Sequence, residues 1–343
     1  MIAGRGPRPG LVLLGVTALW GSTFIVTKEL VGSAPPFTYL AVRFGAAALL
    51  LGPLLLVRPI ADRRRFVRDS LLIGLLNAFG LVLQVLGQVY TTASKSSFIT
   101  SLNTPLAALA ALAIYRAVPT GPQRVALALA TTGLLLLTWP TGGAAFNPGD
   151  LLTLGCATLY AFFIVESARR APRHDAVAFA ASQIVIAAVL FAGCVAVARG
   201  LAHAAAPADL PAILRLELRP FPRGARVAWQ LGYMTLVCTA LIMLLQTWAL
   251  QRLSAATAAV IFAVEPVIAT AIAIAVDGAA EWPGPRGAAG AVLVLCAVYV
   301  AERRALRRVS HTAAASPSQA SADGEASSRN EPPKSQPLDF GAQ

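Results

Sequence analysis

Residues 90–115, YTTASKSSFITSLNTPLAALAALAIY, decide the fold. A helix rises about 1.5 Å per residue, so an apolar bilayer core of about 30 Å needs about 20 residues. Residues 93–113 meet this length, and Pro105 lies in their middle. A proline there frees a carbonyl group that, inside a membrane, only a protein partner or an aqueous cavity can satisfy. The stretch therefore predicts a membrane-spanning helix beside a polar space.

Polar side chains gather on one side of this predicted helix. At 3.6 residues per turn, Phe98, Ile99, Leu102 and Leu106 fall on the opposite side. The polar arc consists of Ser96, Ser97, Thr100, Ser101, Asn103 and Thr104. Hydroxyl groups can also join helices to each other in lipid, but that packing usually needs only one or two of them. We therefore expect the first five residues of this arc to line a substrate cavity.

The composition indicates an all-α integral membrane protein. Of the 343 residues, 57% are hydrophobic and 13% are charged, whereas soluble domains carry about 25% charged residues. The apolar segments are unbroken runs, which argues against the alternating pattern of a membrane β-barrel. The net charge of +12 is expected at the membrane edges. No basic run with interleaved aromatic residues suggests a nucleic-acid partner, so the lipid bilayer is the expected partner.

The hydrophobic pattern predicts ten membrane spans and a polar tail. The predicted spans are residues 11–30, 36–56, 71–90, 93–113, 123–139, 151–167, 177–197, 229–249, 255–276 and 287–301. The fifth and tenth spans are short because prolines bound them. Residues 310–343 are rich in Ser, Ala, Pro and charged residues, which predicts a disordered cytoplasmic tail.

The distribution of arginine predicts that both termini are cytoplasmic, in a multi-pass protein of the cell (inner) membrane. Arginines are frequent in the loops that share a side with the N-terminus and are nearly absent from the short loops opposite. The exception is the loop 198–228, which is basic although it is predicted outside. Long connections escape this rule, and residues 212–218 could form an amphipathic interfacial segment.

Cysteine and histidine give no sign of a metal or a cofactor. Cys156, Cys194, Cys238 and Cys296 all fall inside predicted spans and lack CxxC spacing. They are interpreted as small buried apolar residues. The three histidines lie in loops or in the tail, so we expect neither a metal site nor a cofactor.

The two halves of the chain, residues 1–140 and 149–302, can be laid over each other. Residues 11–20 match residues 151–160 at a constant offset. On these alignments Trp20 pairs with Tyr160, Arg43 with Gln183, Gln84 with Gln246, and Pro105 with Pro266. Each half has five predicted spans, an odd number, so the second half must enter the bilayer inverted. Inverted repeats around a central cavity are typical of secondary transporters.

Short motifs in both halves resemble the EamA-type repeats of the drug/metabolite transporter superfamily. The motifs are Leu19-Trp20-Gly21-Ser22, Arg43 after Pro35-Pro36, the stretch 91–105, Gly149-Asp150-Leu151-Leu152, and the stretch 254–266 that ends in Glu265-Pro266. Each motif is weak, but their order and spacing over two halves is specific. The resemblance implies ten helices as two inverted five-helix repeats, a central cavity, and export or exchange of small metabolites such as amino acids.

Three cations of the first half are candidate anion contacts. Arg43 lies seven residues into the second span, about 10 Å below its outer end. Lys28 and Lys95 lie at the outer ends of the first and fourth spans, where together with Arg43 they could bind a carboxylate. Both lysines could instead extend to the lipid head groups, and Arg43 could serve a structural ion pair or bind carbonyl groups.

Glu265 lies about midway along the ninth span, with no lysine or arginine at helical spacing in its own helix. A buried carboxyl group in that position could carry a coupling proton or bind a substrate ammonium group, although an ion pair with Arg43 is the competing account. Trp20 and Tyr160 could form a cavity wall or pack in the core. Gln84 and Gln246 are interpreted as cavity hydrogen-bonding groups or as contacts between helices.

These observations predict a secondary transporter that moves a small metabolite by alternating access, with export the expected direction. Amino acids or related zwitterions and anions are the first hypothesis for the substrate. Efflux of cationic or amphipathic drugs, with Glu265 as the main polar contact, is the alternative. A membrane enzyme acting on a lipid is the alternative from another class, but acidic residues are few and scattered. Coupling to a proton and assembly as a homodimer remain open.

Overall fold

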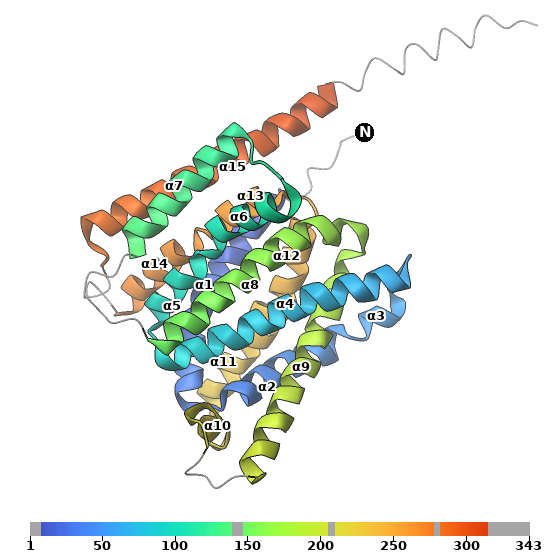
Figure 1. The fold of residues 1–343 in the computed structure, drawn as a ribbon, viewed down its shortest axis with the longest axis vertical. Helices are drawn as coiled ribbons and strands as arrows, with labels where there is room; N and C mark the ends of the chain where they lie inside the picture. Colours follow the sequence, from blue (N-terminus) through green and yellow to red (C-terminus); the bar gives the residue numbers. More distant parts are fainter. Residues whose placement is uncertain (1–7, 139–146, 205–209, 278–281, 315–343) are drawn as a thin grey trace, which may run out of the picture. The chain divides into compact units, whose positions relative to one another are not determined.

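The computed structural model describes residues 8–138, 147–204, 210–277 and 282–314. The described residues up to Ala301 form one compact unit, and the described residues from Glu302 onward belong to a second one. Of the predicted tail, residues 315–343 lie outside the described residues, whereas residues 310–314 continue the last helix. All regular secondary structure in the described part of the chain is helical (Figure 1).

The elements follow the predicted spans closely. In chain order they are α1 (Pro9–Ser33), α2 (Pro36–Leu51), α3 (Leu54–Val57), α4 (Arg63–Tyr90), α5 (Ala93–Ser101), α6 (Asn103–Tyr115), α7 (Gly121–Thr138), α8 (Pro148–Arg170), the 3₁₀ turn η1 (Ala171–Arg173), α9 (Ala176–Ala204), α10 (Ala212–Glu217), α11 (Ala225–Thr235), the π-helical turn η2 (Leu236–Leu241), α12 (Ile242–Leu250), α13 (Ala255–Phe262), α14 (Glu265–Asp277) and α15 (Gly284–Ala314). Over the described residues, nine segments are long and apolar enough to cross a membrane, and a tenth, Gly121–Leu137, is shorter. The prediction of an all-α membrane protein is confirmed.

The fourth span of each half is a broken helix. The first break separates α5 from α6 at Leu102, and the second separates α13 from α14 at residues 263–264. Pro105 and Pro266 follow the breaks and cannot donate the backbone hydrogen bond that a continuous helix requires. The broken helices pack on each other, α5 on α14 and α6 on α13. Where they meet, the Thr104 hydroxyl donates to the Ala259 carbonyl at 2.9 Å.

A second irregularity interrupts the span formed by α11 and α12. The six residues of η2 form a π-helical turn between them. Such turns are less stable than an α-helix and usually persist where a side chain satisfies the displaced backbone groups. The group that does so here is Arg43, as described below.

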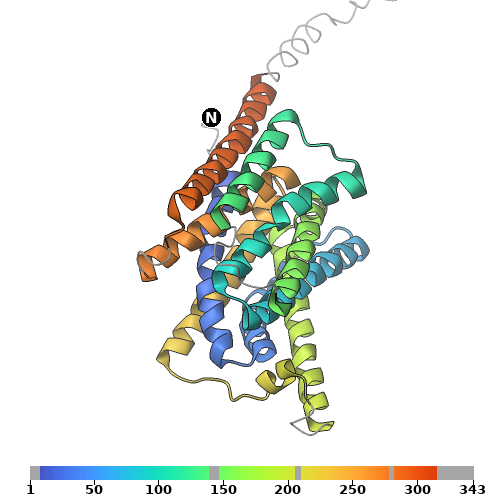
Figure 2. The same cartoon turned by 60° about the vertical axis from the view of Figure 1, so that its left-hand side comes forward.

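The helices α4 and α8 pack side by side and make the most extensive contact between two helices in the described part of the chain (Figures 1 and 2). Glycines allow this close approach. A Cβ atom on Gly80 would lie 2.7 Å from the Tyr160 ring, and one on Gly149 would lie 2.6 Å from the Gly87 carbonyl oxygen. In lipid, where apolar burial does not drive association, small residues at such contacts allow van der Waals packing between helices.

This packing predicts that Gly80→Val destabilises the protein, because the added methyl groups must displace the Tyr160 ring from the cavity wall. We expect a loss of about 2 kcal/mol in the free energy of unfolding, measured in detergent by denaturant titration. Gly45→Ala is the control, since a Cβ atom there meets nothing within 4 Å. Equal stability of the two variants would contradict the packing argument.

Candidate functional site

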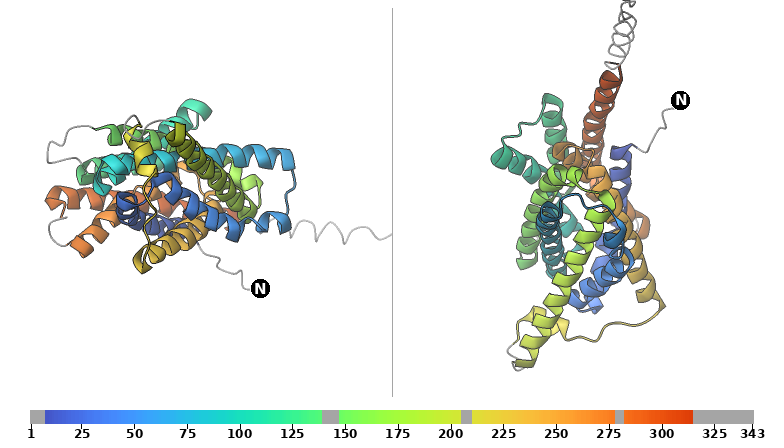
Figure 3. Two further views of the ribbon diagram at one scale, coloured as in Figure 1. Left: turned by 90° about the horizontal axis from the view of Figure 1, so that it is seen from below. Right: turned by 90° about the vertical axis from the view of Figure 1, so that its right-hand side faces the viewer.

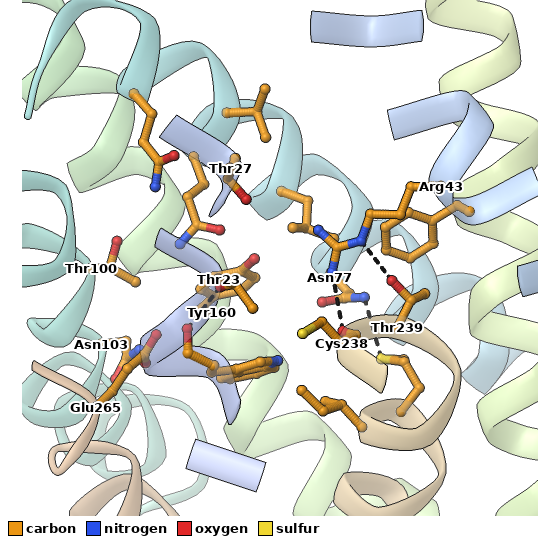
Figure 4. Close-up of a pocket in the computed structure, with 18 residues that line it drawn as sticks. Thr23, Thr27, Arg43, Asn77, Thr100, Asn103, Tyr160, Cys238, Thr239 and Glu265 are labelled. Carbon is orange, nitrogen blue, oxygen red and sulfur yellow. Dashed lines mark hydrogen bonds between the residues drawn. The ribbon is translucent and has the colours of Figure 1, made fainter. Parts of the chain in front are cut away.

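A cavity lies between the two halves of the chain (Figure 4). Its empty volume, including the solvent-filled space at its open mouth, is about 660 Å³. Its lining residues come from α1, α2, α4, α5, α6, α8, η2, α12 and α14. They are Trp20, Thr23, Thr27, Arg43, Phe44, Asn77, Leu81, Gln84, Val85, Gln88, Thr100, Asn103, Tyr160, Cys238, Thr239, Ile242, Met243 and Glu265. Both halves of the chain contribute to this lining.

Arg43 lies at one end of the cavity, and its guanidinium group forms hydrogen bonds at the π-helical turn. It is 5% exposed, and its Nε donates to the Met234 carbonyl at 3.2 Å and to the Thr239 hydroxyl at 2.6 Å. Nη1 donates to the Tyr39 hydroxyl at 3.3 Å and Nη2 to the Cys238 carbonyl at 3.1 Å. Each terminal nitrogen carries two N–H groups, so each has one left to bind another acceptor. The carbonyl contacts support the structural interpretation of Arg43, and its place in the lining leaves it available to an anion.

Glu265 lies at the opposite end of the same cavity, near Thr100, Asn103 and Tyr160 (Figure 4). It is the first residue of α14 and is 4% exposed. The structure gives its carboxyl group no hydrogen bond and no ion pair with any described residue, so the predicted alternative of an Arg43–Glu265 ion pair is absent here. A buried carboxylate without a partner is unfavourable, and binding a proton or a cation removes that cost.

Aromatic rings form the wall between these two polar ends. The Trp20 ring stacks on Phe262 with centroids 5.4 Å apart and on Tyr160 with centroids 6.4 Å apart. Trp20 and Tyr160 both line the cavity. Of the two sequence-based interpretations of this pair, the geometry supports the cavity wall, with Phe262 as a packing partner behind it.

The polar face of α4 supplies lining residues that the sequence analysis missed. Asn77, Gln84 and Gln88 follow at spacings of seven and four residues, which places them on one helical face. Asn77 Nδ2 lies 3.9 Å from the Met243 sulfur, and Gln88 Oε1 is buried without a partner among the described residues. This spacing is visible in the sequence, but Gln84 alone was identified, from its match to Gln246 in the repeat.

The predicted polar arc divides in the structure. Thr100 and Asn103 line the cavity. Ser96, Ser97 and Ser101 are buried outside its lining, where Ser101 donates to the Ser97 carbonyl at 2.8 Å. The hydroxyl groups of Ser96 and Ser97 have no hydrogen-bond partner among the described residues. They lie outside the lining because α5 is packed by other helices on several sides, including α8, α14 and α1.

Gln246 also lies outside the lining, although its repeat partner Gln84 is part of it. It is 1% exposed, and neither of its amide atoms has a partner among the described residues. Buried polar atoms of this kind usually bind ordered water. The two repeats thus place equivalent glutamines in different surroundings.

Lys95 does not reach the cavity, contrary to the expectation that it contacts an anionic substrate there. Its Nζ lies 2.6 Å from Asp150 Oδ2, and the Asp150 side chain is fully buried. Asp150 also accepts from the Thr91 hydroxyl at 3.0 Å and caps the start of α8 through the Asn147 backbone at 2.8 Å. Lys95 therefore joins α5 to α8. A buried carboxylate without a nearby cation is strongly destabilising, and Lys95 supplies that cation to Asp150.

Lys28 is held in the same region. Its Nζ donates to the carbonyl oxygens of Gln88 and Thr91 at 2.5 and 2.8 Å, which satisfies the C-terminal end of α4. Neither lysine joins Arg43 in an anion site, so Arg43 is the cation that remains in the described lining. We call this end of the bundle, with Lys28, Lys95 and Asp150, the Lys28 end.

A second ion network lies at the other ends of α4 and α8, away from the Lys28 end. Asp69 is fully buried and lies 2.6 Å from Arg170 Nη1 and 3.1 Å from His174 Nε2. Arg170 also pairs with Glu166 at 2.5 Å, and Glu166 accepts from the Tyr115 hydroxyl. Among the described residues, no group of three or more His, Cys, Asp or Glu side chains converges as a metal site would require. These charges are satisfied by each other and connect α4, α6, α8 and η1.

The Lys95–Asp150 pair predicts a change in stability from Lys95→Met. The substitution leaves the Asp150 carboxylate buried without its cation, and we expect a loss of about 3 kcal/mol in unfolding free energy. The double variant Lys95→Met, Asp150→Asn should recover most of it. A denaturant titration in detergent measures both. If Lys95→Met instead left stability unchanged and weakened substrate affinity, the structural role assigned to Lys95 would be wrong.

Comparison with known proteins agrees with this architecture. The model of the EamA-like transporter family matches residues 8–139 and 147–302. An uncharacterized transporter of Archaeoglobus fulgidus (strain ATCC 49558 / DSM 4304 / JCM 9628 / NBRC 100126 / VC-16) is 34% identical over 151 residues, which are 44% of this chain and 45% of that protein. A solved crystal structure of a protein shares 18% identity, covers 88% of this chain and 99% of its own, and superposes with a TM-score of 0.65, a likeness of fold. The chain belongs to the EamA-like transporter family and is a multi-pass membrane protein.

Proposed function

We propose that the protein is a secondary transporter for a small zwitterionic metabolite of the amino-acid type. The observation that carries the proposal is the pair of opposite charges in one cavity, Arg43 and Glu265, which do not neutralise each other (Figure 4). The free N–H groups of Arg43 suit a carboxylate, and the unpartnered carboxyl group of Glu265 suits an ammonium group. The substrate lies against the rings of Trp20 and Tyr160.

Transport proceeds by alternating access. The broken helices place the N-terminal ends of α6 and α14, with Asn103 and Glu265, at the cavity. Broken helices of this kind bind substrates and coupling ions in transporters built from inverted repeats. Glu265 carries a proton when it is not occupied by the substrate ammonium group, which couples export of the metabolite to proton entry. Both termini are cytoplasmic in this scheme.

Efflux of cationic, amphipathic compounds is the second candidate. The stacked rings of Trp20, Tyr160 and Phe262 favour it, because aromatic faces attract organic cations and apolar rings. In that case Glu265 is the main polar contact and Arg43 serves only the π-helical turn.

Counterflow in proteoliposomes tests the proposal. Wild-type protein is expected to take up labelled amino acids from a mixed pool against a preloaded unlabelled pool, with rates that differ between pH 6 and pH 8. Glu265→Gln keeps the size of the side chain but cannot ionise. We therefore expect it to lose the pH dependence and to lower the rate by about tenfold or more.

Glu29→Gln is the matched control, since Glu29 lies outside the cavity lining and its side chain is 44% exposed. It should retain both the rate and the pH dependence. Uptake of a lipophilic cation, with no amino acid transported, would replace the zwitterion by the second candidate. Transport of neither class would contradict both.

A further inference from the structure

The first turn of α2 is capped by a residue far away in the sequence. Helix α2 begins at Pro36, and the residue before it, Pro35, makes no side-chain hydrogen bond that would cap the helix. The backbone N–H groups of Phe37 and Thr38 donate instead to Glu217 Oε2 at 2.9 Å and Oε1 at 3.0 Å, and the Thr38 hydroxyl donates to the same carboxyl group. Glu217 thus satisfies two of the free donors at the start of this helix.

The Glu217 carboxyl group is held by α2 alone. It is 1% exposed, and no ion pair joins it to a lysine or arginine in the described part of the chain. The positive end of the α2 dipole and the three donated hydrogen bonds are what stabilise its charge. Removing either partner would leave polar groups buried and unsatisfied, which is costly.

Glu217 ends α10, a short helix in the connection between α9 and α11. In Figures 2 and 3, α10 lies beside one end of α9, and it packs on α9 and α2. Helix α11, which follows this connection, is held at the end of α1, where Glu29 accepts from Arg226 and Gln230, both at 2.8 Å. The connection therefore spans the ends of α1 and α2 at the Lys28 end.

The capped helix is the one that carries Arg43. Arg43 lies five residues beyond Thr38, about 7.5 Å along the axis of α2. Its guanidinium group must keep its height relative to Met234, Cys238 and Thr239 to make its three hydrogen bonds to the second half. A small slide or rotation of α2 would break them, so the axial position of α2 decides whether Arg43 stays at the cavity.

We infer that Glu217 is a positioning residue for the binding cavity, because its cap on α2 keeps the Arg43 guanidinium against the π-helical turn. The segment with α10, between α9 and α11, then has a role in binding, since Glu217 fixes the position of α2 and therefore of Arg43. The effect on transport rests on the proposed function, whereas the effect on Arg43 does not. Loss of the cap lets α2 shift and withdraws Arg43 from Cys238.

The native Cys238 reports this shift without any substrate. It lines the cavity, is 2% exposed, and its carbonyl accepts from Arg43. In a background where Cys156, Cys194 and Cys296 are alanine, the rate of labelling of Cys238 by a small methanethiosulfonate reagent in detergent is measured. We expect Glu217→Ala to raise this rate by about tenfold, and Glu217→Gln, which keeps one acceptor oxygen, to raise it less.

Glu29→Gln is the control, because it weakens the contact of α11 with α1 while the cap on α2 remains. It should leave the labelling rate of Cys238 unchanged. If Glu217→Ala elutes as a monodisperse species and labels no faster than the parent, the inference is wrong. If it does not fold, Glu217→Gln decides in the same way.

Counterflow kinetics provide a second test, because a general loss of stability would lower the maximal rate and leave the KM unchanged. For any amino acid that the parent transports, Glu217→Gln should raise the KM several-fold with little change in the maximal rate. Faster labelling of Cys238 without any amino-acid transport in the parent would support the positioning role and refute the zwitterion proposal, so the two can fail separately.

Discussion

The structure depends on the insertion of Arg43 into the π-helical turn η2. Inside a membrane, backbone polar groups cannot be satisfied by water, so an irregular turn persists only where the protein supplies their partners. Arg43 supplies them to the Met234 and Cys238 carbonyls and to the Thr239 hydroxyl. In return, the turn gives a buried guanidinium group the acceptors it requires. The same contact joins a helix of the first half to a span of the second.

Other buried polar groups of the chain meet the same requirement through charged partners. Lys28 satisfies the end of α4, and Lys95 and Arg170 balance the buried carboxylates of Asp150 and Asp69. The described groups without a partner include the Glu265 carboxyl group and Gln88 Oε1 at the cavity, and Ser96, Ser97 and Gln246 outside its lining. Those at the cavity are available to a substrate, a proton or water. The site differs from the structural ion networks because its two charged groups, Arg43 and Glu265, do not pair with each other.

Much of this could be predicted from sequence because it depends on local rules. Hydrophobic length predicted the spans, and Glu265 and Arg43 stood out as charges inside apolar segments. Pro105 and Pro266 were paired across the two halves, but the breaks beside them were not predicted. Partner choice could not be predicted, because it depends on how helices rotate and pack. Lys95 faces Asp150 across 55 positions of sequence, and Glu217 caps α2 from about 180 residues away. Ser96 and Ser97 share the composition of a cavity face but lie against packed helices.

In the proposed transport cycle, one cavity between the two halves opens to each side of the membrane in turn. Asn77 lies on its wall, so Asn77→Cys in a background without the four native cysteines is a direct reporter. The measurement is its labelling, in oriented vesicles, by a membrane-impermeant thiol reagent added to either face. The account predicts labelling from both faces, with transported substrate in excess slowing both. Labelling from one face only, whatever the substrate, would contradict alternating access through this cavity.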